Sequence, residues 1–141
     1  MTFPRSAHDA TRGLIYFARM IDKMRLVCAG QLPDAYLPFI GEGFDGRVCH
    51  FLKIDYPAIR DRAALGGTDE ELLEWCFQNG RRPSEQEILV WNKYASKTGW
   101  RDEDTGATGR LEKNKAGSGL AGRTDIVTFF DYYDYDEGRR A

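Results

Sequence analysis

The sequence has few of the residues that carry chemistry. It holds only two histidines, His8 and His50, and its three cysteines form no C-x-x-C motif. Two histidines leave little choice of base for a Ser-His-Asp or Cys-His arrangement, and Walker A and H-E-x-x-H motifs are absent. These absences argue against a catalytic triad, a P-loop nucleotide site and a zinc protease site.

The chain also lacks long hydrophobic runs and an excess of positive charge. No apolar run approaches ~18 residues, and residues 1–5 turn polar at once, so neither a membrane span nor a signal peptide is expected. The net charge of −2 provides no broad positive field, so nucleic acid is not expected as a partner. We interpret Cys28, Cys49 and Cys76 as small buried apolar residues in a reducing compartment and predict cytoplasmic localisation.

What is present indicates a helical protein. At 141 residues, of which 42% are hydrophobic and 30% charged, the chain can bury a core without a metal or a disulfide. No alternating strand pattern extends beyond a few residues, and no repeat of fixed period occurs. We therefore predict an all-α fold, one compact domain over residues 1–141 with about five to six helices after an N-terminal arm at 1–10.

The predicted helices follow from periodicity and capping signals. The longest covers residues 11–29 and has one apolar face, formed by Leu14, Phe17, Ala18, Ile21, Met24 and Cys28. A loop at 31–43 is interrupted by prolines. Further helices are predicted at residues 44–53, 55–65, 69–78 and 85–97. The last two begin with capping boxes, at residues 68–71 and 84–87.

The end of the chain is predicted to be a loop followed by a docking helix. Residues 101–123 are polar and contain five glycines, which is typical of a long loop, with a short helical piece at 111–116 as the alternative. Residues 124–138 then form a helix that docks on the core. Its acidic residues, 131–137, miss the spacing of an EF-hand and are interpreted as a solvated face, or as a partner-binding edge with aromatic anchors.

Residues 41–46 match G-x-G-x-x-G, the fingerprint of a dinucleotide phosphate loop. Such a loop follows a strand and opens a helix in a βαβ unit, whereas here Pro38 precedes the motif and no parallel strand follows it. Glu42 and Asp45 would also place negative charge beside a phosphate, and residues 117–122 match the same pattern. We therefore predict no nucleotide and no other cofactor.

The densest group of reactive residue types is Asp45, Arg47, Cys49 and His50. On a helix Asp45 and Cys49 share a face while Arg47 and His50 point elsewhere, so a converging metal site is not expected. Cys49 and His50 lie about 100° apart around the helix, which argues against a thiol nucleophile with His50 as its base. We interpret Asp45 as the helix N-cap and Cys49 as a packing residue.

Charged residues also lie at the edge of the apolar face of the first helix. Arg25 falls beside Ile21 and Cys28, and Asp22 is one turn earlier, where it can pair with Arg25. A charge beside the core is costly unless it is paired. Two interpretations stay open: a snorkelling arginine in a surface ion pair, or a polar pocket wall in which Arg25 binds a carboxylate or phosphate.

Three segments carry a family resemblance: residues 19–23 with Arg25, residues 41–50 leading to Asp55, and residues 68–76 continuing to Asn92. In these segments the chain resembles a bacterial family described only as a domain of unknown function, number 5069. The resemblance covers roughly residues 14–101 and the final segment 125–138. It implies a small cytosolic helical protein without an assigned activity, and it places recurrent polar residues at Asp22, Lys23, Arg25 and Asp45.

We predict a non-enzymatic helical module that binds a protein or a small anionic ligand, with a homodimer as one form of partnership. The predicted ligand-binding residues, none of them catalytic or metal-binding, are Asp22, Lys23, Arg25, Asp45, Arg47 and His50. The alternative is a small cytosolic enzyme with Asp45 or His50 as acid–base and Arg25 or Arg47 as anion anchor. An interior polar cleft would favour the enzyme, and an exposed apolar patch near Trp91, Tyr94 and Trp100 the interaction module.

Overall fold

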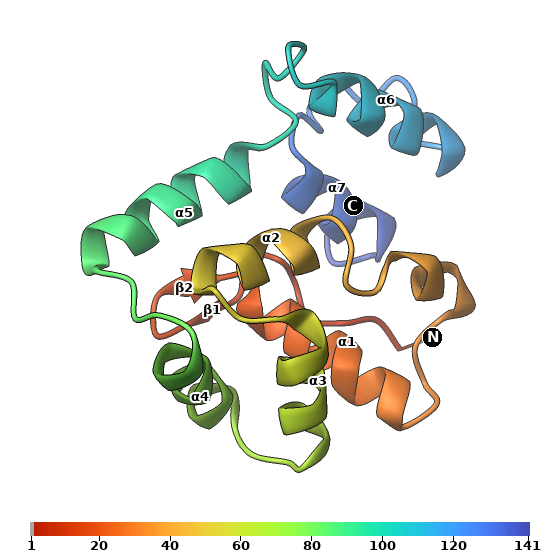
Figure 1. Ribbon diagram of the computed structural model, residues 1–141. Helices are drawn as coiled ribbons and strands as arrows, with labels where there is room; N and C mark the ends of the chain where they lie inside the picture. Colours follow the sequence, from red (N-terminus) through yellow and green to blue (C-terminus); the bar gives the residue numbers. More distant parts are fainter. Residues whose placement is uncertain (1) are drawn as a thin grey trace. The chain divides into compact units, whose positions relative to one another are not determined.

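The computed structural model describes residues 2–141, and helices dominate it (Figure 1). In the described residues there are seven α-helices, one 3-10 helix and a two-stranded antiparallel sheet. Their bounds are β1 (Ala10–Thr11), β2 (Leu14–Ile15), α1 (Phe17–Cys28), η1 (Asp34–Phe39), α2 (Phe44–Leu52), α3 (Tyr56–Ala64), α4 (Asp69–Asn79), α5 (Glu85–Lys97), α6 (Ala107–Gly117) and α7 (Phe129–Asp136). The all-α prediction is confirmed in its broad form, whereas the predicted number of helices is too low.

The chain divides into two compact units, the first ending at Val90 and the second covering Trp91–Ala141. The division falls inside α5, so this helix contributes to both. No helix in residues 2–141 is long and apolar enough to cross a membrane.

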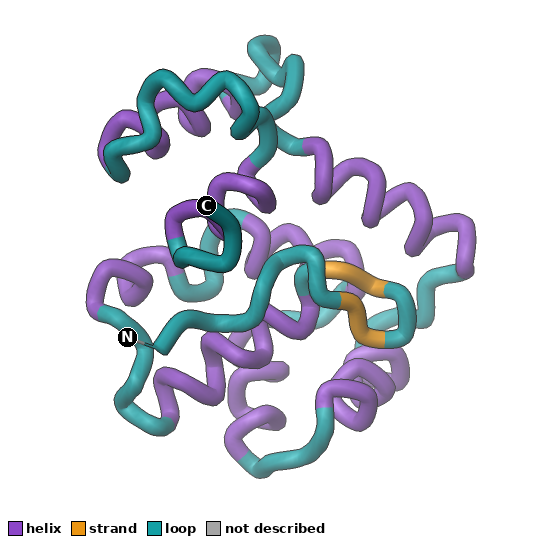
Figure 2. The backbone as a smooth tube through the Cα atoms, turned by 180° about the vertical axis from the view of Figure 1, so that it is seen from behind, coloured by secondary structure: helices purple, strands orange, loops and turns teal. Residues whose placement is uncertain are grey.

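Helix α1 supplies the core of the first unit. Phe17, Ala18, Met20 and Ile21 are completely buried, and α1 contacts β1, α2, α3 and α4. The helix begins at Phe17 rather than at residue 11, because the preceding residues form a hairpin, seen in orange in Figure 2. Arg12 and Gly13 turn it with φ of 48° and 82°, and two positive φ values in a two-residue turn are those of a type I′ hairpin.

Helices α2 to α5 lie close to their predicted bounds because their ends are marked in the sequence. Thr68 Oγ1 accepts from the amide of Glu71 at 3.1 Å, and Glu71 Oε1 accepts from the amide of Thr68 at 3.2 Å. Ser84 and Glu87 make the same reciprocal pair at 3.2 and 2.9 Å. Both predicted capping boxes are therefore confirmed. The proline-containing loop before α2 includes η1, none of whose side chains is buried.

The turn between α4 and α5 holds the C-terminal end of α2. The amide of Arg81 donates to the carbonyl of Leu52 at 2.9 Å, and Arg81 Nε donates to the carbonyl of Phe51 at 2.7 Å. The guanidinium of Arg81 lies over the Phe51 ring, 4.7 Å from its centroid, and forms an ion pair with Glu87. Gly80 permits this approach, because a Cβ atom there would lie 2.1 Å from the carbonyl oxygen of Leu52.

The second unit contains a helix within the stretch predicted to be a loop, and this helix includes the alternative helical piece at residues 111–116. Helix α6 buries Ala107, Leu111 and Lys115, which lie at four-residue spacing on one face. Lys115 Nζ donates to the carbonyls of Arg123 at 2.7 Å and Ile126 at 3.0 Å, and so closes the following loop. A lysine at a core position hides the apolar face of α6 from a periodicity argument.

The last helix is shorter than predicted. It starts at Phe129, after Thr128, whose hydroxyl accepts from the amide of Asp131 at 3.2 Å. The N-cap hydroxyl marks the helix start, and residues 124–127 remain outside the helix.

We expect Gly80→Ala to lower the free energy of unfolding by about 3 kcal/mol or more, because backbone atoms must move to admit the methyl group. Urea denaturation measures this loss. The matched control is Gly109→Ala within α6, where a Cβ atom meets nothing within 4 Å. That substitution should stabilise by about 0.5–1 kcal/mol. Equal effects of the two substitutions would contradict the role given to Gly80.

Candidate functional site

All six predicted ligand-binding residues lie in the first unit, but they do not form one cluster. Lys23 and Asp45 meet directly, with 2.7 Å between Lys23 Nζ and Asp45 Oδ1. Asp22 and Arg25 each have other partners, described below. Arg47 lies over the ring of Phe44, 4.9 Å from the centroid, and His50 is exposed. The six residues therefore separate into a buried pair, Lys23 and Asp45, and four residues that lie apart from it, Asp22, Arg25, Arg47 and His50.

Asp45 is the centre of a buried polar network. Its side chain is completely buried, and that of Lys23 is 8% exposed. Tyr16 Oη donates to Asp45 Oδ1 at 2.7 Å and accepts from Lys23 Nζ at 3.1 Å, while the amide of Gly41 donates to Asp45 Oδ2 at 3.0 Å. Within residues 2–141 no buried side-chain nitrogen or oxygen lacks a hydrogen-bond partner. The network is therefore closed and satisfied, as a buried ion pair requires.

The G-x-G-x-x-G segment builds the loop around Asp45 rather than a phosphate site. Gly43, not Asp45, is the N-cap of α2, and its φ of 56° and ψ of −125° belong to a region that only glycine adopts readily. A Cβ atom on Gly46 would lie 3.2 Å from the carbonyl oxygen of Gly41. The prediction of Asp45 as an N-cap is wrong, because its carboxylate turns back toward the Gly41 amide and inward to Lys23.

Tyr16 reaches this network from a strained backbone. It precedes α1 with a φ of 75° and a ψ of −33°, a conformation that non-glycine residues rarely adopt and that costs on the order of 1–3 kcal/mol. Its ring lies 5.5 Å from that of Phe44 and is almost fully buried. The surrounding packing and the two hydrogen bonds of its hydroxyl hold the residue in place.

The buried environment keeps the nearby thiol neutral. Burial, and then the negative charges of Asp45 and Asp55, raise the pKa of Cys49 to about 12. Its Sγ atom lies 3.6 Å from Met20 Sδ. Burial likewise raises the pKa of Cys76 to about 12. The interpretation of Cys49 and Cys76 as packing residues is confirmed, whereas Cys28 is exposed, because it lies at the C-terminal end of α1.

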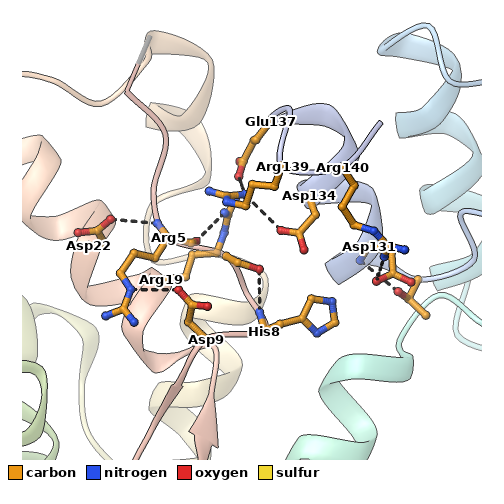
Figure 3. A network of polar contacts seen from close by, with 12 residues as sticks. Arg5, His8, Asp9, Arg19, Asp22, Asp131, Asp134, Glu137, Arg139 and Arg140 are labelled. Carbon is orange, nitrogen blue, oxygen red and sulfur yellow. Dashed lines mark hydrogen bonds and ion pairs between the residues drawn. The ribbon is translucent and has the colours of Figure 1, made fainter.

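Arg25 lies at the rim of the first unit with a different carboxylate from the one predicted. Its Nη1 lies 2.6 Å from Asp69 Oδ1, and its Nη2 donates to the carbonyl of Gly67 at 3.0 Å. Asp22 instead accepts from the backbone amide of Arg5 at 2.9 Å (Figure 3). Asp69 is shared, since Arg5 Nη1 lies 2.7 Å from its other oxygen.

A groove of about 360 Å³ opens beside Arg25. It lies between the C-terminal ends of α1 and α3, and its lining residues are Met24, Arg25, Cys28, Ala29, Ala63, Ala64 and Gly66. Arg62, on α3, donates from Nη1 to the carbonyl of Gly66 at 2.8 Å. The sequence predicts Arg25 as a ligand-binding residue but does not predict the α3 side of the groove. The alanine pair before Gly66-Gly67 is the only local signal for it.

The acidic end of the chain is paired within the second unit. Arg139 Nη1 lies 3.3 Å from Asp134 Oδ1 and 2.5 Å from Glu137 Oε1, and Arg140 pairs with Asp131 at 3.3 Å (Figure 3). Asp134 and Glu137 are buried, so this helix end is not the uniformly solvated face expected. No group of three or more metal-ligating residues occurs in the described part of the chain.

We expect Asp45→Asn to lower the free energy of unfolding by about 3–5 kcal/mol, because it leaves the buried Lys23 ammonium without a counter-charge. Chemical denaturation measures the loss. Asp61→Asn is the matched control, since Asp61 forms an ion pair with Arg60 in which the aspartate side chain is 75% exposed. It should change stability by less than about 0.5 kcal/mol. If Asp45→Asn changed the free energy of unfolding as little as the Asp61→Asn control does, the buried charge would not be needed for stability.

The raised thiol pKa values predict both selective labelling and alkaline sensitivity. Iodoacetamide should modify Cys28 in the folded protein and all three cysteines in denaturant. Because Cys49 and Cys76 ordinarily ionise at 9.0 and their folded pKa is about 12, the unfolded state loses protons first as the pH rises. The stabilising contribution of these two buried, neutral thiols is therefore fully present below about pH 9, and the free energy of unfolding should fall as the pH rises above it. Fast labelling of Cys49 or Cys76 in the folded protein would contradict this burial.

Comparison with known proteins identifies the family but adds no activity. A search of curated proteins found no significant match. A family model described as "Domain of unknown function (DUF5069)" matches residues 1–139. The resemblance to family 5069 is thereby confirmed over almost the whole chain. This protein belongs to the DUF5069 family.

Proposed function

We propose that this protein is a non-enzymatic helical module that binds a small anionic ligand in the groove between the C-terminal ends of α1 and α3. One observation carries the proposal: Arg25, whose guanidinium bonds to Gly67 next to the lining residue Gly66, itself lines the groove. A volume of about 360 Å³ is at the lower end of the range in which proteins hold small molecules. Arginine is the residue best suited to hold a carboxylate or phosphate through paired N–H donors.

The charges at the rim support an anion. Arg5 and Arg25 share the single carboxylate of Asp69. Asp9 also pairs with Arg5, at 3.1 Å across exposed side chains, so Arg5 is the better neutralised of the two. Arg62 forms no ion pair with a carboxylate in residues 2–141, and its guanidinium donates to a backbone carbonyl. Arg62, one residue before the lining residue Ala63, therefore keeps a positive charge that no carboxylate of the described residues neutralises.

The enzymatic alternative has less geometric support. Both carboxylate oxygens of Asp45 are engaged in a buried network and the side chain is completely buried, so a substrate could reach it only by disrupting this network. His50 is five residues further along α2 and exposed. A general acid or base must come within hydrogen-bond reach of the proton that it transfers, and neither Asp45 nor His50 lines the groove.

Thermal denaturation should be measured in the presence of a panel of small carboxylates and phosphates. We expect one of these anions to raise the melting temperature by several degrees. The Arg25→Ala variant should show no such rise. Arg60→Ala is the matched control, because Arg60 also lies on α3 but outside the groove lining. Each variant is compared with its own ligand-free melting temperature. A shift that survives Arg25→Ala, or turnover of the bound anion, would contradict the proposal.

A further inference from the structure

We propose that the ligand of this groove is an amphiphilic monoanion, an aliphatic carboxylate whose chain fills the groove and whose carboxylate binds between Arg25 and Arg62. The proposal rests on the function proposed above and names the class of ligand. It follows from three features of the first unit. The groove has an apolar lining, and Arg25 and Arg62 donate to the carbonyls of two consecutive residues. At the ends of α1 and α3, several of the last carbonyls already accept hydrogen bonds from backbone amides.

The lining of the groove favours an apolar body. Apart from Arg25, the groove is bounded by small or apolar residues, namely Met24, Cys28, Ala29, Ala63, Ala64 and Gly66. Apart from the weak S–H donor of Cys28, such a wall offers no side-chain hydrogen-bond donors for the far side of a compact anion. An inorganic anion would leave this wall in contact with water, whereas an aliphatic chain removes it from water.

Exposed apolar side chains flank the same groove in the sequence. Leu65, between the lining residues Ala64 and Gly66, is 82% exposed, and Val27, next to Cys28, is 40% exposed. Single exposed apolar residues are ordinary on protein surfaces. These two adjoin lining residues of the groove in the sequence, at the C-terminal end of α1 and at the C-cap of α3.

The polar end is formed by two guanidinium groups bonded to consecutive carbonyls. Arg62 Nη1 donates to the carbonyl of Gly66 at 2.8 Å, and Arg25 Nη2 donates to the carbonyl of Gly67 at 3.0 Å. Arg25 already holds Asp69 through Nη1, so it offers its remaining N–H groups, whereas Arg62 has more donors left in the planar fork that matches the two oxygens of a carboxylate. Arg62 Nη1 and Nη2 would also lie 3.8 Å from a Cβ atom on Gly67, so both guanidinium groups lie beside this residue, where one carboxylate can be shared between them.

The C-terminal ends of α1 and α3 do not reverse the preference of the groove for an anion. Two helix C-termini at one place favour a cation, because their last carbonyls carry partial negative charge. Here the amide of Gly30 donates to the carbonyl of Val27 and that of Gln31 to the carbonyl of Leu26, while at the end of α3 Leu65 and Gly66 donate to Arg62 and Ala63. These closing hydrogen bonds engage carbonyls that a cation would need, whereas the charges of Arg25 and Arg62 remain.

Cys28 gives a direct readout of occupancy, because it lines the groove and is the exposed cysteine. Octanoate, below its micelle-forming concentration, should slow the modification of Cys28 by iodoacetamide at least about tenfold, as followed by mass spectrometry of the labelled peptide. Inorganic phosphate, which has no chain, and octan-1-ol, which has no charge, should each slow it less than about twofold.

Variants locate the effect. Arg62→Ala should abolish protection by octanoate, and Arg62→Lys should retain part of it, because lysine keeps the charge without the fork. Arg60→Ala, on the same helix, should leave protection unchanged. Ala64→Trp fills the groove from an exposed position and should also abolish octanoate binding, which keeps the test independent of the stability of the arginine variants.

The outcomes separate this inference from the proposed function. Equal protection by phosphate and octanoate would overturn the requirement for a chain and leave the anion-binding module standing. Equal protection by octan-1-ol and octanoate would overturn the anionic head group and with it the role of Arg25. Absence of protection by octanoate, together with an anion from the panel that acts through Arg25, would overturn the ligand class alone. Absence of any effect in both experiments would overturn both proposals.

Discussion

The buried ion pair between Lys23 and Asp45 is the interaction on which the first unit depends. It joins α1 to α2 where the Asp45 side chain is completely buried and that of Lys23 is 8% exposed, and Tyr16 and the Gly41 amide complete its hydrogen bonds. An ion pair of this kind contributes little net stability compared with apolar residues, but removal of one partner is severe. Its effect is therefore to specify one arrangement: the loop at residues 41–46, the start of α2 and the strained entry to α1 must all be in place together.

The same helix carries the proposed binding residue. Lys23 and Arg25 are two residues apart on α1, so one side chain enters the core while the other reaches the rim. Fixing α1 through Lys23 also fixes where Arg25 lies relative to α3, whose C-terminal end forms the opposite wall of the groove. The core thus positions a guanidinium that is partly exposed beside an apolar groove. Because Lys23 points into the core and Arg25 to the rim, the polar residues predicted from the sequence do not gather in one pocket.

Local signals account for what the sequence predicted well. The ends of α4 and α5 are written as capping boxes, and Gly80 and Pro83 separate them, so their bounds could be placed closely. The start of α1 was missed because the Arg12–Gly13 turn is short and lies within a helical apolar pattern. For α6 the sequence predicts only a short helical piece at residues 111–116, as the alternative to a loop, because Lys115 occupies a core position. The partners of Asp45 and Arg25 lie 22 and 44 residues away, and no periodicity argument specifies contacts at such separations.

A double-mutant cycle on Lys23 and Asp45 tests the central claim most directly. It compares the unfolding free energies of Lys23→Met, Asp45→Asn, the double variant and the unmodified protein, and so isolates the coupling between the two charges. If the pair fixes α1 against α2, the coupling energy should be at least about 1.5 kcal/mol, and the double variant should be more stable than either single variant. A coupling below about 0.5 kcal/mol, the size expected for an exposed ion pair, would contradict the account.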